Sequence, residues 1–286
     1  MKSAYSMFSF DENADLDWAL GHIAEAGYQG VELVMGQSGY LTPSTGDADL
    51  GRIRAAASSA GLEIHSVGVW SIWENNLLSD DPAVRSKAYS ILSCQLNAAS
   101  VLGASRTLMV PGYVGCDFIE GSRRVGYTDA WNRAIDAFGR LGELASDLKV
   151  RIGIETVWNK FLLSPLEMKN FIDEIDNPSV GVYLDTGNVI YTGYPEDWLD
   201  VLGGRIAGIH LSDYRRSQAG LGAFVDLFAG DVDFEAVAAA LARAGWDDYL
   251  TLEMLPNYRR FPELSCYSNK PAVDRIIDMV NSQRGR

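Results

Sequence analysis

The most constraining feature of this chain is a regular alternation of short apolar runs with longer segments of helical spacing. Eight runs are rich in β-branched and aliphatic residues, lack a polar alternation and are too short for helices. Such runs are typical of strands buried on both faces of a parallel sheet. The predicted strands lie at residues 4–10, 30–35, 62–70, 105–111, 150–156, 180–185, 206–212 and 249–255.

Between these runs, apolar residues recur at intervals of three and four, which indicates amphipathic helices. Gly103 and Gly245 follow two of these segments, and Asp81 and Ser164 each precede a proline at the start of another. A glycine is typical just after a helix, and a capping residue before proline is typical of its start. The predicted helices are 16–27, 50–61, 82–103, 129–147, 164–175 and 233–245, with a last one ending the segment 258–280.

Eight strand–helix units in 286 residues match a (β/α)8 TIM barrel, an α/β fold for which about 250 residues are typical. Because no shift in composition marks a boundary, we expect residues 1–286 to form a single barrel domain with a C-terminal helical extension. A doubly wound open sheet is the alternative. It is disfavoured because no GxGxxG segment follows the first strand.

Four metal-competent side chains stand near the ends of four successive predicted strands. They are Glu155, Asp185, His210 and Glu253, which close the runs VRIGIE, VGVYLD, IAGIH and YLTLE. One such residue alone is usually a helix cap or an ion-pair partner. In a barrel, however, the carboxyl ends of the strands share one rim, where active sites are built. The pattern therefore predicts one site for a divalent cation.

Three carboxylates and one imidazole suit Mn²⁺, Mg²⁺ or Co²⁺, and Zn²⁺ is also compatible. We expect one divalent ion, with Mn²⁺ as the first choice. Adjacent hydroxyl and carbonyl oxygens of a ketose could complete its coordination. The ion would then polarise the carbonyl and stabilise the enediolate that forms when a neighbouring C–H is deprotonated.

Glu155 and Glu253 belong to the fifth and eighth strands, which are not neighbours in a closed barrel, so they could approach a sugar from opposite sides. If one glutamate removes a proton and the other returns one to the opposite face, the carbon centre is inverted and the sugar is epimerised. Transfers on a single face would give aldose–ketose isomerisation. Loss of a hydroxide would give dehydration.

Side chains that follow strand ends are candidates for substrate contacts. Aromatic rings can pack against a sugar face, polar groups can bind hydroxyls, and adjacent arginines can bind a distal hydroxyl or phosphate. For each residue the alternative is loop packing, turn capping or a solvated position. The candidates are Trp70, Trp73, Glu74, Tyr113, Trp158, Asn188, Arg215 and Arg216, with His65 as a pocket-lining group.

Charge and hydropathy narrow the partners. The net charge of −14 repels phosphate backbones, which argues against nucleic acid but not against a small anionic substrate. No apolar run reaches the roughly 18 residues of a membrane span, and the first residues lack the apolar core of a signal peptide. We therefore expect no membrane partner and a cytoplasmic location. The three cysteines are widely separated and form no CxxC, so no disulfide framework is expected.

Over nearly its whole length the chain resembles the xylose-isomerase-like barrel superfamily, in particular the ketose and ketose-phosphate 3-epimerases. The resemblance implies that Glu155, Asp185, His210 and Glu253 hold the cation, that both glutamates act as the acid–base pair, and that the protein is a homodimer or homotetramer. The segments that carry it are GYQGVELVM (27–35), GLEIHSVGVW (61–70), IGIET around Glu155, YLDTGN (183–188), RIAGIHLSDY (205–214), GDVDF (230–234) and YLTLEML (249–255).

The chain departs from the free-sugar epimerases, which commonly carry a second glutamate after the first ligand and a histidine after the aspartate. Here these regions read TVWNKF (156–161) and Asn188, and the spacing and the DTGN segment look closer to the sugar-phosphate epimerases and inosose dehydratases. We expect a metal-dependent 3-epimerase of a ketose or ketose phosphate. The alternatives are a sugar or inosose dehydratase, an aldose–ketose isomerase, or a non-catalytic sugar-binding subunit of a larger complex.

Overall fold

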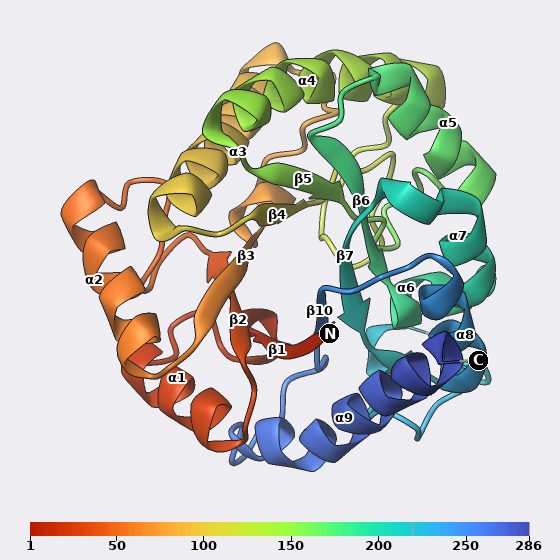
Figure 1. Cartoon of the computed structure of the whole chain (residues 1–286). Helices are drawn as coiled ribbons and strands as arrows, with labels where there is room; N and C mark the ends of the chain where they lie inside the picture. Colours follow the sequence, from red (N-terminus) through yellow and green to blue (C-terminus); the bar gives the residue numbers. More distant parts are fainter. Residues whose placement is uncertain (219, 286) are drawn as a thin grey trace.

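The computed structural model describes residues 1–218 and 220–285. Parallel strands close into a barrel in the order β1–β10–β7–β6–β5–β4–β3–β2 (Figure 1). This confirms the (β/α)8 prediction and excludes an open sheet. The barrel strands are β1 (Lys2–Ser6), β2 (Gly30–Met35), β3 (Glu63–Val69), β4 (Arg106–Met109), β5 (Arg151–Ile154), β6 (Val180–Asp185), β7 (Ile206–Leu211) and β10 (Tyr249–Leu252).

Helices form a ring around the barrel (Figure 1). The last of them, α9, contacts β1, β10 and α8 and so covers the seam where the first and last strands meet. Among the described residues, no helix combines the length and apolarity needed to cross a bilayer. The helices are α1 (Leu16–Glu25), α2 (Asp47–Ser59), α3 (Pro82–Leu102), α4 (Tyr127–Leu148), α5 (Pro165–Ile175), α6 (Thr186–Ile190), α7 (Pro195–Leu202), α8 (Phe234–Arg243) and α9 (Leu264–Arg284).

The predicted helix caps are present. The Asp81 side chain accepts a hydrogen bond from the amide of Ala83, and the Ser164 hydroxyl accepts one from the amide of Glu167. Gly103 ends α3 with a φ of 82°, the left-handed conformation that glycine adopts without strain. These local signals set the helix boundaries to within a few residues of the prediction.

Four elements were not predicted, namely α6, α7 and a small antiparallel hairpin of β8 (Asp213–Tyr214) and β9 (Phe224–Val225). Two-residue strands are too short to show a periodic pattern. The prediction for the first strand was also too long, because the chain turns into a 3-10 helix at Met7–Ser9, capped by the Ser6 hydroxyl. This turn ends β1 before residue 10.

The core has an apolar layer between helices and barrel, to which α1, α3 and α4 contribute Leu20, Leu92 and Phe138. Tyr183 on β6 is buried beside the site. A Cβ at Gly208 on β7 would lie 2.5 Å from the Tyr183 ring, so this close approach requires glycine. The ring in turn packs edge-on against His210, with centroids 4.7 Å apart.

Candidate metal centre

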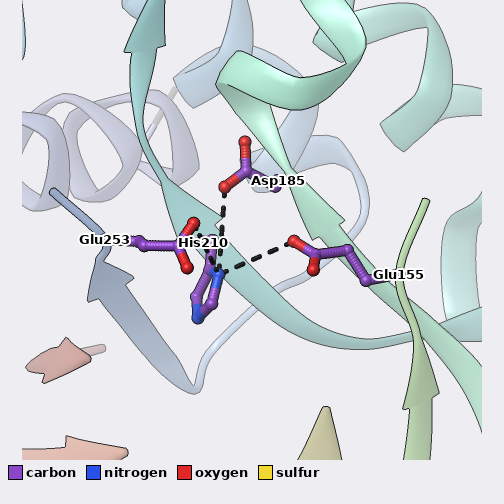
Figure 2. A group of neighbouring side chains, drawn as sticks. All are labelled: Glu155, Asp185, His210 and Glu253. Carbon is purple, nitrogen blue, oxygen red and sulfur yellow. Dashed lines mark ion pairs between the residues drawn. The ribbon is translucent and has the colours of Figure 1, made fainter. Parts of the chain in front are cut away.

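Glu155, Asp185, His210 and Glu253 converge at the carboxyl end of the barrel (Figure 2). Each side chain is buried, and each offers one ligand atom within 4.8 Å of the other three. Nδ1 of His210 is the common neighbour: it lies 3.7 Å from Glu155 Oε1, 3.8 Å from Asp185 Oδ2 and 3.5 Å from Glu253 Oε2. The four predicted side chains therefore form one cluster.

Strand register explains the convergence. Asp185 pairs with His210 across β6 and β7, and His210 pairs with Thr251 across β7 and β10. Glu253 lies two residues beyond Thr251, just past the end of β10, and alternate residues of a strand face the same side. Glu155 likewise follows β5 by one residue, so both glutamates extend from the rim rather than from within a strand.

Two buried atoms of the cluster indicate that the donor set fits a divalent cation. Asp185 Oδ1 accepts hydrogen bonds from the Asn188 amide (2.6 Å) and from the Ser212 hydroxyl (2.5 Å). Asp185 Oδ2 and His210 Nδ1 have no hydrogen-bond partner among the described residues, although both are buried. Unpaired buried polar atoms are costly. A cation bound between them would satisfy both, and three oxygens with one nitrogen are suitable ligands.

The electrostatics of the metal-free cluster favour bound protons. Burial raises the pKa of Glu155 to about 8 and that of Asp185 to about 7, and the nearby charge of Glu253 adds to both shifts. Burial alone would lower the pKa of His210, but Glu32 and Glu253 outweigh it and hold that pKa well above its usual value. A divalent cation would compete with these protons for the same atoms.

A carboxylate that was not predicted from the sequence contacts this cluster. Glu32 on β2 is fully buried, and its Oε1 lies 2.7 Å from His210 Nε2. The signal was a lone charged residue inside the apolar run GVELVM, because a buried charge needs a specific partner. Its partner is 178 positions away, so the pattern alone could not identify it.

Asn188 is the one predicted substrate contact that directly touches the cluster in the structure. It is buried, and its side-chain amide donates a hydrogen bond of 3.3 Å to Glu155 Oε1. Its backbone amide donates to the side chain of Asp185, which caps the start of α6. Asn188 thus holds two members of the cluster in place.

The aromatic candidates lie in different environments. Trp70 is 43% exposed and packs against Phe8, whereas Trp73 and Tyr113 are buried, with Trp73 against Phe118. Trp158 lies in an aromatic group whose other members are Tyr191, Tyr214 and Phe224.

The polar candidates other than Asn188 are exposed. Glu74 is exposed on the loop that follows β3. Arg215 donates to the backbone oxygen of Ala229, and the Arg216 guanidinium lies 5.6 Å from the centre of the Tyr194 ring. His65 lies deeper in the barrel, stacked on Tyr249 at the first residue of β10, so it is placed away from the rim.

Known proteins similar to this chain include sugar epimerases and an inosose dehydratase. An L-ribulose 3-epimerase of Methylomonas sp. (strain DH-1) is 26% identical over 256 residues, which cover 86% of this chain and 81% of that protein. An inosose dehydratase of Geobacillus thermodenitrificans (strain NG80-2) is 24% identical over 213 residues, covering 67% of this chain and 70% of that protein. A solved structure of an L-ribulose 3-epimerase superposes with a TM-score of 0.80 at 20% identity, covering 99% of this chain and 96% of that one.

The prediction of an isomerase-type enzyme is confirmed by the epimerases among these relatives. The family model for xylose isomerase-like TIM barrels matches residues 20–280, which are most of the chain. The chain therefore belongs to the xylose isomerase-like TIM barrel family.

Proposed function

We propose that this protein is a divalent-metal-dependent 3-epimerase of a ketose or ketose phosphate. The observation that carries the proposal is the placement of two buried glutamates around one imidazole. Glu155 extends from β5 and Glu253 from β10, and these strands are separated in the barrel by β6 and β7. The 3-epimerases among the relatives support the same reaction.

The cation would be held by Glu155, Asp185, His210 and Glu253, and we propose Mn²⁺ as that ion. When bound, it would polarise the substrate carbonyl and lower the barrier to removing the proton on the adjacent carbon. Mg²⁺, Co²⁺ and Zn²⁺ are the alternatives that the same donor set accepts.

The two glutamates would move the protons. In the metal-free protein, burial raises the pKa of Glu155 to about 8, and a bound cation would lower that pKa toward the range of a general base at neutral pH. Asn188 donates to Glu155 Oε1, which leaves Oε2 for a substrate proton. Glu253 would act on the other face of the same carbon. Removal on one face and return on the other inverts the centre.

Isotope exchange tests the reaction. Metal-loaded protein is incubated in D₂O with ketohexoses and ketopentose 5-phosphates, and deuterium is located by NMR. An epimerase places deuterium at C3 of both substrate and product. Exchange at C1 alone would instead identify an aldose–ketose isomerase, and binding without any exchange would identify a sugar-binding subunit.

A dehydratase is the second candidate, because inosose dehydratases of two bacterial species are similar to this chain. The same cluster could deprotonate carbon next to a carbonyl, after which hydroxide leaves from the neighbouring carbon instead of a proton returning. Incubation with an inosose, followed by mass spectrometry, would show a product lighter by one water. That result would replace the epimerase proposal.

The substrate contacts are also proposals, and substitution to alanine should raise KM most at residues that touch the sugar. We also propose that the protein is a homodimer or homotetramer, and sedimentation would measure this oligomeric state. The proposed contacts are Trp70, Trp73, Glu74, Tyr113, Trp158, Asn188, Arg215 and Arg216.

A further inference from the structure

The two ring nitrogens of His210 face different groups. Nδ1 faces the three carboxylates of the cluster at 3.5 to 3.8 Å, whereas Nε2 lies 2.7 Å from Glu32 Oε1. His210 and Glu32 are both fully buried. Their strands, β7 and β2, are separated in the barrel by β10 and β1, so Glu32 reaches His210 through the interior of the barrel.

The hydrogen bonds around Glu32 fix the direction of this contact. The Ser6 hydroxyl donates to the same oxygen, Glu32 Oε1, at 2.7 Å, and Ser6 pairs with Glu32 across β1 and β2. An oxygen that already accepts from a hydroxyl acts as an acceptor toward the imidazole as well. Nε2 of His210 therefore carries the hydrogen. Nδ1 is then the nitrogen that faces the carboxylates, and a cation bound there would take the place of its proton.

Packing alone does not fix the orientation of the His210 ring, so the hydrogen bond to Glu32 has to do so. Tyr183 contacts the imidazole edge-on, and glycine at position 208 gives the tyrosine its space. Such a contact restricts the plane of the ring but does not distinguish its two nitrogens, whereas the Glu32 carboxylate does. The hydrogen bond to Nε2 thus selects which nitrogen meets the cation site.

We propose that Glu32 is a positioning residue that fixes the tautomer and orientation of His210 and thereby sets the metal affinity of the site. The proposal rests on the proposed metal site. If Glu32 served only to stabilise the fold, an apolar residue of similar volume should be able to replace it. Burying a carboxylate is unfavourable for folding, and apolar residues of similar volume often replace buried charges without loss of stability.

Metal titration of Glu32→Gln and Glu32→Leu separates the two roles. Apo protein is titrated with Mn²⁺ by calorimetry. Loss of a carboxylate behind a metal-binding histidine typically weakens metal affinity 10- to 100-fold. We expect Glu32→Leu near the upper limit and Glu32→Gln nearer the lower one, because an amide oxygen still accepts from Nε2. Asp213→Asn is the control, since Asp213 is a buried carboxylate that binds the backbone amides of Gly230 and Val232.

A spectroscopic measurement tests the tautomer directly. Only three histidines are present, so ¹⁵N-labelled histidine gives a simple spectrum. In protein loaded with Zn²⁺, which is diamagnetic, the wild-type His210 should show a protonated Nε2 that exchanges slowly with water. In Glu32→Leu this proton should exchange rapidly. A structural role would change the melting temperature but not this signal.

Unchanged Mn²⁺ affinity in Glu32→Gln and in folded Glu32→Leu would overturn the inference, as would a wild-type protein that binds no Mn²⁺. If Glu32→Leu does not fold, Glu32→Gln decides alone. Weakened Mn²⁺ binding in the variants supports the inference even if the wild-type protein shows no deuterium exchange with any ketose. That last result would count against the epimerase proposal only.

Discussion

At the amino end of the barrel, ionisable side chains form ion pairs and hydrogen bonds with their neighbours. At the carboxyl end, carboxylates lie around a single imidazole. At the amino end, Arg106 forms an ion pair with Asp248 and donates to the backbone oxygen of Ala207. Glu63 accepts from Lys2 at 2.8 Å and from the Tyr249 hydroxyl at 2.7 Å. Arg106, Glu63 and Tyr249 are the first residues of their strands, so this network closes that end of the barrel.

His65 and His210 show the same difference in one residue type. Burial lowers the pKa of His65 to about 3, so this histidine is neutral and stacks on Tyr249. His210 is equally buried, but carboxylates surround it and hold its pKa well above its usual value. Burial determines the pKa of His65, where nearby charges are already paired. Nearby carboxylates determine the pKa of His210 at the other end of the barrel. The charges at the amino end are thus compensated within the protein, whereas the carboxyl end offers donor atoms that could hold a cation.

The largest expected effect is loss of activity at the carboxyl end. Glu155→Gln and Glu253→Gln should each lower turnover and deuterium exchange by about 10²–10⁴-fold, the usual contribution of a positioned acid or base. Rates are measured at saturating Mn²⁺. Glu63→Gln, at the amino end, is the matched control and should retain normal rates. Near-normal turnover in either cluster variant with its metal bound would show that the paired-base mechanism is wrong.

Metal addition should produce the next largest effect. A ligand that binds only the folded state at 100 times its Kd stabilises a protein by about 2.7 kcal/mol. For a domain of this size that corresponds to a rise in Tm of about 5–10 °C. Differential scanning fluorimetry with EDTA and with Mn²⁺ measures it. Asp185→Ala should lose the rise while Glu63→Gln keeps it, and an equal rise in Asp185→Ala would place the metal elsewhere.

The sequence predicted one end of the barrel better than the other, for a physical reason. Cluster residues stand at the ends of apolar runs, and parallel strands bring those ends to one rim whatever the loops do. Asp185 ends β6 as predicted, and Glu155 and Glu253 lie one residue beyond their strands. The amino-end network and the Glu32–His210 contact join residues more than 60 positions apart, and no local pattern records such pairs.

Loops set a second boundary on prediction. Trp70 and Trp73 are only three positions apart, yet the first is 43% exposed and the second 8%. Both follow β3 in a short 3-10 turn whose direction depends on its tertiary contacts. Side chains in such turns were therefore chosen as substrate contacts by residue type alone, and their burial could not be predicted from the sequence.

Breaking the pair at the amino end should affect stability alone. Asp248→Asn leaves Arg106, whose side chain is 9% exposed, without its carboxylate. Removing one partner of a buried pair costs about 3–5 kcal/mol. Asp248 is 40% exposed, so solvent screening reduces this to about 1–2 kcal/mol. Urea unfolding measures the loss. Mn²⁺ affinity and deuterium exchange should stay unchanged, and a loss of either would mean that the two ends are coupled.

A pH dependence of the metal-free protein should arise at the carboxyl end between pH 6 and pH 9. The pKa values of Glu155 and Asp185 are raised to about 8 and 7 by burial, so the folded state binds protons more tightly than the unfolded chain. Their contribution to stability is complete below about pH 4 and is lost as the pH rises through 7 to 8. The raised pKa of His210 acts in the same direction.

We therefore expect the Tm of EDTA-treated protein to fall between pH 6 and pH 9, because deprotonation of these buried acids removes stability over this range. Glu155→Gln removes one of the buried acids and should flatten this slope, while Asp248→Asn should lower the whole curve and keep its slope. Saturating Mn²⁺ should also flatten it, because the cation replaces the protons. A Tm that rises with pH in the metal-free wild type would contradict the proton-holding cluster. An unchanged slope in Glu155→Gln would show that Glu155 does not produce the effect.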